Sequence, residues 1–266
     1  MIGIIGAIVG DLIGQSYEFH STKDYNFKLL TPDSHVTDDS TCTIAVADWL
    51  MNTDRTADDL IDKFKYWCRK YNYGFAPRFD HWINSDNREP YYSFGNGSAM
   101  RVSPCAWVAN SLEECIDLAK RSAEVTHNHP EGVKGAITIA VAIYLNRIGK
   151  NKDEIIDFIT QETDYKLQSY EELYRTHIFN CVCQCSVPAC LTCWYESDSY
   201  EDCIRKAISL GGDADTEGCI AGSICNANPN TQISDELVIK LCESGYIPND
   251  FINIINQFHN TYEIKK

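Results

Sequence analysis

The sequence lacks long hydrophobic runs, and this absence excludes a membrane-spanning class of protein. Its longest uncharged apolar run covers residues 136–145, whereas a spanning helix needs about 20 apolar residues. The apolar N-terminal stretch has no basic segment and is interrupted by Asp11, so it does not resemble a signal peptide. We therefore expect a cytoplasmic protein that does not associate with membranes.

Positive charge is also scarce, because 23 lysines and arginines stand against 38 aspartates and glutamates, for a net charge of −15. Such a chain repels a phosphate backbone, which argues against non-specific nucleic-acid binding. An anionic ligand would need a bound cation or a helix N-terminus. With 266 residues, 44% of them hydrophobic, and no Pro-, Ser- or Gly-rich linker, the chain is predicted to form a single domain over residues 1–266. We expect a monomer.

Cysteine is plentiful, but the thirteen residues are an odd number without a secretory signal, which argues against a disulfide framework. Five of them lie close together and could form a zinc or redox site. Apolar residues that suit helix packing stand between them, and a free cysteine behaves as a small hydrophobe. We therefore favour core packing for Cys181, Cys183, Cys185, Cys190 and Cys193.

Helix signals recur along the chain, whereas strand signals are few. Apolar residues at helical spacing follow Ser, Thr, Asn or Pro starts in residues 56–70, 111–125, 130–148, 151–162, 199–210, 234–244 and 248–262. We predict an all-α fold of about ten helices, arranged as one compact orthogonal multi-helix domain. Residues 74–94 are polar and aromatic without a period, and we predict a long loop that sets substrate specificity. Its candidate contacts are Arg78, His81, Trp82, Tyr91 and Tyr92.

The first predicted helix carries glycines at positions 3, 6, 10 and 14. Glycine weakens a helix by about 1 kcal/mol, so this pattern indicates that another backbone approaches closely. Asp11 and Glu18 are seven residues apart and fall nearly on one face. This helix is therefore predicted to form the wall of a site. The alternative is a core helix in which Asp11 bonds the N-terminus of a neighbouring helix.

Two acidic clusters each stand directly before an apolar helix. The first is VTDDST at residues 36–41, and the second contains Asp213, Asp215 and Thr216. N-capping needs only one such side chain per helix, and the helix dipole opposes a cation there, so excess carboxylate is the expected compensation. If the clusters meet, their four carboxylates and hydroxyls suit Mg²⁺ or Mn²⁺ better than zinc. Such a set can hold two ions about 3.5–4 Å apart.

Two further segments are candidate parts of this site. Glycines flank Asn96 in residues 93–102, and such a turn can bring backbone N–H groups against phosphates; the alternative is a plain turn before a helix. His127 and His129 lie between two predicted helices. They could bind phosphate or ribose, or they could be structural.

Taken together, these segments resemble the ADP-ribosylglycohydrolase family. The matching pieces run in the family's order over nearly the whole chain: GDLIGQSYEF (10–19), VTDDST (36–41), FGNGSAMR (94–101), THNHPEGVKGA (126–136) and SLGGDADTEGCIAGSI (209–224). The resemblance implies an all-α fold of this type with two Mg²⁺ ions, replaceable by Mn²⁺, at the base of an ADP-ribose cleft. The implied metal ligands are Thr37, Asp38, Asp39, Asp213, Asp215 and Thr216.

The resemblance also implies the residues that contact substrate and the reaction. The implied substrate contacts are Glu18, Ser93, Phe94, Gly95, Asn96, Gly97, Ser98, His127 and Gly212. Glu18 or Asp38 would be the catalytic acid or base for cleavage of the bond between ADP-ribose and a protein side chain or a small molecule. Ser93 stands where the arginine-directed branch carries an acidic residue, which favours an O-linked acceptor. Residues 225–232 lack the family's tyrosine and glycine pattern, which leaves the contacts to the adenosine end open.

Two other functions are compatible with these residues. The family resembles some lens crystallins, so a non-catalytic ADP-ribose-binding or structural protein is one alternative. A magnesium phosphohydrolase acting on nucleotides is the other, because it would use the same ions and release phosphate rather than ribose.

Overall fold

The computed structural model describes residues 3–262, so residues 1–2 and 263–266 of the predicted domain lie outside the described part. Within that part there is no strand, and a single antiparallel bridge joins Gly95 to Val182. The all-α prediction is confirmed, but the helices outnumber the ten predicted. They are α1 (Ile5–Gly14), the 3₁₀ helix η1 (Gln15–Tyr17), α2 (Asp38–Asn52), α3 (Ala57–Lys70), α4 (Pro77–Asn84), α5 (Gly97–Met100), α6 (Ser103–Val108), α7 (Leu112–Glu124), α8 (Pro130–Arg147), α9 (Lys152–Glu162), α10 (Tyr170–Thr176), α11 (Cys183–Tyr195), α12 (Tyr200–Ser209), α13 (Ala214–Cys225), α14 (Asp235–Glu243) and α15 (Asn249–Thr261).

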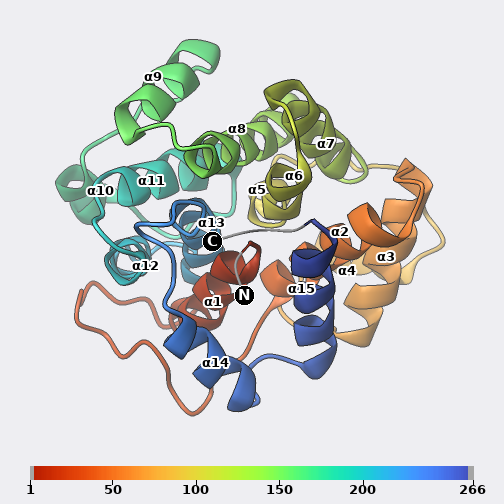
Figure 1. Ribbon diagram of the computed structural model, residues 1–266, viewed down its shortest axis with the longest axis horizontal. Coiled ribbons are helices and arrows are strands. Elements are labelled where there is room, and N and C mark those ends of the chain that lie inside the picture. Colours follow the sequence, from red (N-terminus) through yellow and green to blue (C-terminus); the bar gives the residue numbers. More distant parts are fainter. Residues whose placement is uncertain (1–2, 263–266) are drawn as a thin grey trace.

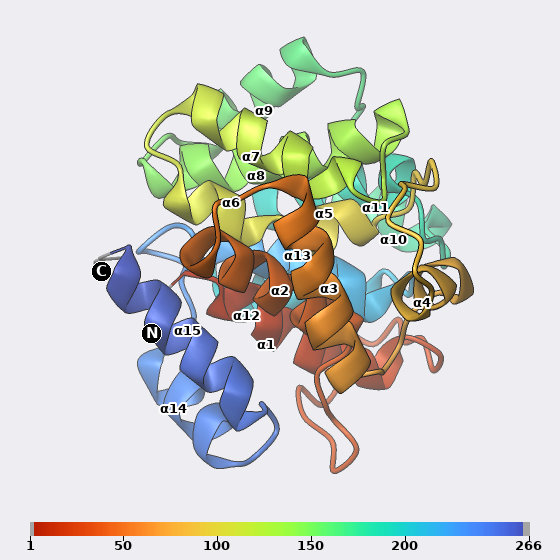
Figure 2. The same cartoon turned by 90° about the vertical axis from the view of Figure 1, so that its right-hand side faces the viewer.

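Helices α1 and α13 lie side by side at the centre of the molecule (Figures 1 and 2). A Cβ atom added to Gly218 would lie 2.5 Å from the carbonyl oxygen of Gly10, and one added to Gly222 would lie 2.6 Å from that of Gly6. No side chain fits between the two backbones at these points. The close approach predicted from the glycine spacing is therefore present, and α13 lies against α1 along its whole length.

Most predicted helix starts carry the expected caps. Thr56 and Asn151 each form a complete capping box with the residue three positions later. The predicted box at Ser111 is incomplete, because the Glu114 carboxylate accepts from the backbone N–H of Asn110 instead. Side-chain caps on the third helical N–H are also made by Ser111, Ser199 and Ser234.

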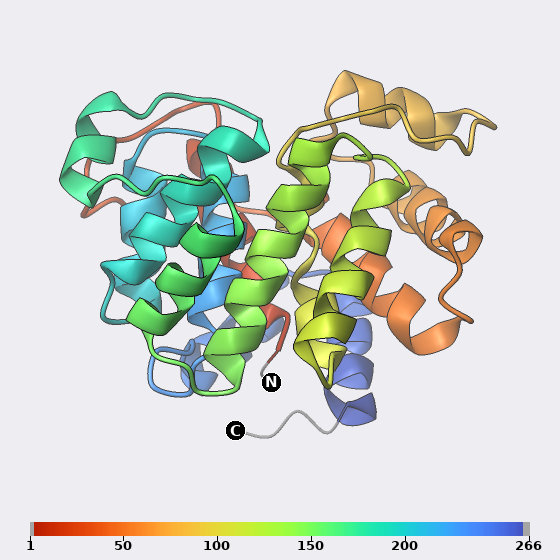
Figure 3. The same ribbon diagram turned by 90° about the horizontal axis from the view of Figure 1, so that it is seen from above.

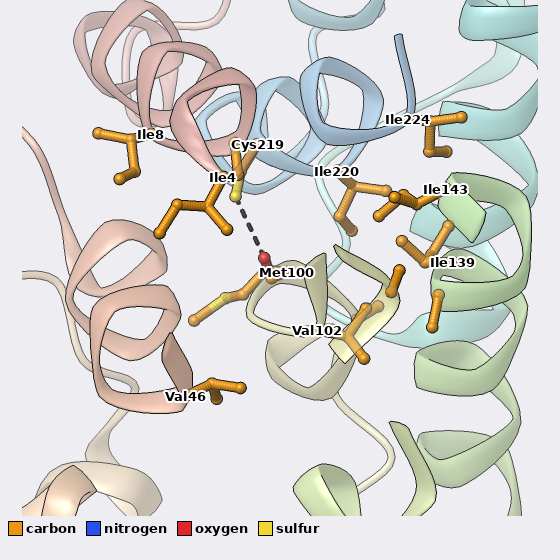
Figure 4. Close-up of a cluster of buried hydrophobic side chains, with 14 of the residues drawn as sticks. Ile4, Ile8, Val46, Met100, Val102, Ile139, Ile143, Cys219, Ile220 and Ile224 are labelled. Atoms are coloured by element: carbon orange, nitrogen blue, oxygen red, sulfur yellow. Dashed lines mark hydrogen bonds between the residues drawn. The ribbon is translucent and has the colours of Figure 1, made fainter. Parts of the chain in front are cut away.

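A core of interlocking aliphatic side chains joins α1, α2, α5, α8 and α13 (Figure 4). The thiol of Cys219 on α13 donates to the carbonyl oxygen of Met100 on α5, at 3.3 Å. This contact and the surrounding isoleucines fix the end of α5 against the middle of α13.

The cysteine-rich segment forms α11, and the core-packing prediction holds for three of its five cysteines. Cys183, Cys190 and Cys193 are buried, whereas Cys181 is exposed and Cys185 is half-buried. For Cys181 and Cys185 the prediction of core packing is wrong. Cys181 precedes the helix, in the segment paired with Gly95, and Cys185 lies in the first turn of α11.

The predicted loop at residues 74–94 contains a helix, α4, which the sequence pattern did not indicate. Pro77 begins it, and Phe79, Trp82 and Ile83 are its buried residues. The Phe79 and Trp82 rings stack with centroids 5.8 Å apart. With only eight residues, α4 shows barely one repeat of the apolar pattern, and its polar neighbours obscure that repeat.

Seen from above, α2–α4 lie on one side of the α7–α8 hairpin and α10–α13 lie on the other (Figure 3). Helix α1 runs between these two sides, which brings the starts of α2 and α13 together. None of the helices in residues 3–262 combines the length and apolar character that crossing a membrane requires.

Candidate functional site

The two acidic clusters meet where α2 and α13 begin. The Thr37 hydroxyl lies 3.4 Å from Oδ2 of Asp215, and the Thr216 hydroxyl lies 3.3 Å from Oδ2 of Asp39. These four side chains are buried. The two clusters, which are more than 170 residues apart in the chain, therefore form one buried acidic surface, which we call the acidic floor.

Asp11 caps the N-terminus of α2, so the carboxylates of α2 do not. One Asp11 oxygen accepts from the backbone N–H groups of Thr37 and Ser40, at 2.9 and 3.1 Å, and the other accepts from the Thr37 hydroxyl at 2.7 Å. Neither Thr37 nor Asp213, the N-cap residues of α2 and α13, makes a side-chain cap. The structure thus shows the predicted alternative for Asp11, and capping does not account for the remaining carboxylates.

Five carboxylates form two groups that share Asp215. Ligand oxygens of Asp11, Asp39 and Asp215 lie within 4.8 Å of one another, and so do those of Glu18, Asp213 and Asp215. Glu18 does not continue α1, which ends at Gly14; it follows the 3₁₀ turn η1 and still reaches Asp215. Asp11 was not among the predicted ligands, and the signal that pointed to it was its glycine-lined helix.

Burial disfavours the charged form of these carboxylates. It raises the pKa values of Asp38, Asp39 and Asp215 well above their usual range. It also raises the pKa of Asp213 to about 6, and that of Glu18 to about 8 with a contribution from the negative charge of Asp215. No lysine or arginine in residues 3–262 forms an ion pair with any of them, and Oδ1 of Asp39 is buried without a hydrogen-bond donor. A divalent cation fits this donor set, because it would neutralise the charge and occupy the unpaired oxygen.

The acidic floor opens into a cleft of about 390 Å³. The glycine-flanked turn forms one wall, held by Asn96, whose amide donates to Oδ2 of Asp213 at 2.8 Å and whose backbone N–H donates to Cys181 at 2.9 Å. Phe19 and Phe179 stand at the rim with ring centroids 6.5 Å apart, and Phe19 is 77% exposed.

Most predicted site residues border this cleft. Those that line it are Glu18, Asp38, Ser93, Gly95, Asn96, Gly97, His127, Asp213, Asp215 and Thr216. Thr37 and Asp39 are not among the lining residues, but they contact Asp215 and Thr216, which are. Asp38 belongs to neither carboxylate group and faces Gly74, where an added Cβ would be 2.8 Å from its Oδ1.

Three predicted substrate contacts lie outside the cleft lining. Phe94 is exposed and packs against the His129 ring, with centroids 5.2 Å apart. The buried Ser98 hydroxyl donates to the carbonyl oxygen of Gly132 at 2.7 Å. Gly212 lies against the buried pair formed by His177 and Glu217, whose Nε2 and Oε1 atoms are 2.6 Å apart.

Residues 74–92 also contribute to the cleft. Of the five candidates, Arg78 and Tyr91 line it, with the guanidinium carbon 4.9 Å from the Tyr91 ring centroid. His81, Trp82 and Tyr92 are not among the lining residues. Sequence reasoning gave no functional role to Arg101, which also lines the cleft although it is almost fully buried.

The fold and the site define an all-α protein with a buried acidic floor beneath a ligand-sized cleft, and similarity to known proteins names its family. The model of the ADP-ribosylglycohydrolase family matches residues 2–248. The chain therefore belongs to the ADP-ribosylglycohydrolase family.

Relatives and a solved structure agree with this assignment. The ADP-ribosyl-(dinitrogen reductase) glycohydrolase of Rhodospirillum rubrum is 24% identical, covering 84% of this chain and 83% of that protein. The ADP-ribosylhydrolase ARH3 of Homo sapiens is also 24% identical, covering 94% and 90%. A solved structure described as an ADP-ribosylglycohydrolase-related protein complex shares the fold, with a TM-score of 0.71, 21% identity, and coverage of 91% and 92%.

Proposed function

We propose that this protein is a Mg²⁺-dependent hydrolase that cleaves the glycosidic bond between ADP-ribose and an acceptor. The observation that carries the proposal is the position of Asp215, which belongs to two carboxylate groups on the floor of a cleft of about 390 Å³. A structural protein has no use for such a buried excess of negative charge. The printed names of the relatives support the same reaction class.

The carboxylate groups suggest which residues would hold two ions. Asp39 and Asp215 would serve one ion beside Asp11, and Glu18, Asp213 and Asp215 would serve the other. Thr37, Asp38 and Thr216 complete the ligand set that the family resemblance implies. When bound, such ions act as Lewis acids that hold ribose hydroxyls and lower the pKa of a water molecule; Mn²⁺ would substitute because it accepts the same oxygen donors.

The chain's own residues would orient the substrate and move a proton. The cleft would hold the distal ribose over the floor, which restricts its orientation toward an attacking water molecule. Nearby carboxylates would stabilise an oxocarbenium-like transition state, as in glycoside hydrolysis generally. Glu18 and Asp38 both line the cleft and are the two candidates for the acid or base, Glu18 beside Asp213 and Asp38 beside Gly74.

The lining of the cleft favours an O-linked acceptor over arginine. Its only carboxylates are Glu18, Asp38, Asp213 and Asp215, all at the floor. The rest of the lining consists of apolar and uncharged polar residues together with the positively charged Arg78 and Arg101. A guanidinium acceptor would therefore have no carboxylate of its own to pair with, whereas an uncharged hydroxyl needs none.

A release assay tests this proposal. Matched peptides carrying ADP-ribose on serine or on arginine are incubated with the protein in Mg²⁺ or EDTA, and the released ADP-ribose is measured by mass spectrometry. We expect release from the serine peptide, abolished by EDTA and by Asp215→Asn, and unchanged by Asp54→Asn at an exposed position. Preferential release from the arginine peptide would reverse the linkage proposal.

Two other outcomes identify the alternatives. Binding of ADP-ribose without release from either peptide would indicate a binding module or structural protein. Release of inorganic phosphate from nucleotides, without release of ADP-ribose, would indicate a phosphohydrolase.

A further inference from the structure

Arg101 carries a buried positive charge that no carboxylate in residues 3–262 neutralises. Its side chain is 1% exposed and its guanidinium carbon lies 4.4 Å from the Phe64 ring centroid. One terminal nitrogen donates to the carbonyl oxygen of Ser122 at 2.9 Å and to the hydroxyl of Thr126 at 2.7 Å. A guanidinium can only donate hydrogen bonds, so the Thr126 oxygen must accept this one.

The Thr126 hydroxyl then has one proton to place and one partner to receive it. Thr126 is fully buried, and its oxygen lies 2.7 Å from Nδ1 of His127. No other acceptor contacts this hydroxyl within the described part of the chain. Since buried hydroxyl groups are hydrogen-bonded, the proton is donated to Nδ1. Nδ1 is therefore an acceptor, and in a neutral imidazole the ring proton must lie on Nε2.

The remaining nitrogen of His127 faces the cleft. A Cβ atom added to Gly97 would lie 3.0 Å from Nε2, and one added to Gly95 would lie 3.5 Å from it. Nε2 has no hydrogen-bond partner among residues 3–262, and His127 lines the cleft. Burial, and then the positive charge of Arg101, hold the pKa of His127 well below its usual range, so the ring is neutral.

We propose that Arg101 and Thr126 are positioning residues that keep His127 in its Nε2–H form, so that it donates a hydrogen bond to a phosphate oxygen of the bound substrate. The glycines at 95 and 97 leave this N–H uncovered, and the unneutralised charge of Arg101 favours an anionic acceptor over a neutral one. The identity of the ligand rests on the proposed function, whereas the tautomer is a property of the protein without ligand.

The tautomer is measured by NMR on the whole protein labelled with ¹⁵N-histidine. Two-bond nitrogen–proton correlations distinguish Nε2–H, Nδ1–H and the cation, and the His127→Gln spectrum identifies the His127 signals. We expect Nε2–H in the wild type and in Thr126→Ser, which keeps the hydroxyl, and a mixture of tautomers in Thr126→Val, which lacks it. A wild-type His127 signal from Nδ1–H or from the cation would overturn the proposal even if neither Thr126 variant folded.

Ligand affinity tests the donor role separately. We expect Thr126→Val to weaken binding of ADP-ribose and of ADP by about tenfold, since a charge-assisted hydrogen bond is lost or populated less, and Thr126→Ser to restore it. Adenosine, which has no phosphate, should bind both variants equally. Thr138→Val is the matched control, because Thr138 is also buried but its hydroxyl bonds only the carbonyl oxygen of Lys134, away from the cleft.

Three results would contradict the proposed donor role of His127. Unchanged binding of ADP by Thr126→Val, despite an altered tautomer, would refute the donor role. Equal weakening by Thr138→Val would reduce the effect to a general loss of packing. Failure of the wild type to bind ADP-ribose or ADP would overturn the proposed function and the donor role with it, while the NMR result would still decide the tautomer.

Discussion

Asp11 on α1 holds the first turn of α2 through Thr37, accepting from both its backbone N–H at 2.9 Å and its hydroxyl at 2.7 Å. The same carboxylate lies within 4.8 Å of Asp39 and Asp215. One side chain therefore fixes the helix that carries half of the acidic floor and also adds to the floor's charge. Asp11 therefore has two roles to test, one as the cap of α2 and one as a member of a carboxylate group, and each can be measured separately.

Asp11→Asn should destabilise the protein without metal. An asparagine offers one accepting oxygen where Asp11 uses two, so at least one buried donor of α2 loses its partner. Loss of a cap or a buried hydrogen bond costs about 1–2 kcal/mol. Urea unfolding in EDTA measures the change, with Asp54→Asn, at an exposed position, as the control. Equal stability of the two variants would mean that capping by Asp11 contributes little.

Gly218→Ala tests the backbone contact between α1 and α13. Helix propensity alone would make alanine more stable by about 1 kcal/mol. The added Cβ, however, would lie 2.5 Å from the carbonyl oxygen of Gly10, which forces the helices apart, so we expect a net loss of about 1–2 kcal/mol. Thermal unfolding checks the sign, with Asp157→Ala on the exposed side of α9 as control. A stabilised Gly218→Ala would show that the helices can separate at no cost.

The sequence predicted the parts of this fold that have local chemical signals. Thr56 and Asn151 mark helix starts because capping requires a side-chain acceptor there, and glycine spacing indicated the contact between α1 and its partner. Helix α4 was missed because eight residues barely repeat a pattern. The same holds for the site. The two acidic clusters could be recognised as sequence motifs, but the contacts between them depend on how α1 and α13 pack.

The sequence offered helix capping as one alternative for Asp11, but neither the helix that it caps nor the role of Arg101 could be read from the sequence, for a physical reason. Whether a carboxylate caps a helix or a guanidinium lacks a counter-charge depends on partners brought together by the fold, such as Thr37 for Asp11 and Thr126 for Arg101. Neither partner has a fixed sequence spacing from the residue it contacts. The predicted ligand roles themselves remain predictions that metal binding must test.

His177→Ala should destabilise the protein more than Glu217→Gln. Glu217 is fully buried, and Nε2 of His177, at 2.6 Å, is the side-chain partner of its carboxylate. Removing the histidine leaves a buried carboxyl group without that partner and costs about 3 kcal/mol, whereas glutamine keeps the shape and a hydrogen bond. Urea unfolding at pH 7 compares the two variants. The reverse order would show that the pair is held by packing against Gly212 rather than by hydrogen bonding.

The number of bound ions should separate the two carboxylate groups. Asp39 belongs to one group and Asp215 belongs to both, so we expect two Mn²⁺ ions per wild-type chain, one for Asp39→Asn and none for Asp215→Asn. Electron paramagnetic resonance of free Mn²⁺ gives these counts without requiring turnover. Mg²⁺ at 100 times its dissociation constant should stabilise the wild type by about 2.7 kcal/mol for each occupied site, and this gain should disappear in Asp215→Asn. Asp54→Asn should bind as the wild type does. Equal counts for Asp39→Asn and Asp215→Asn would mean that the acidic floor acts as one site, and the two-ion arrangement would then be wrong.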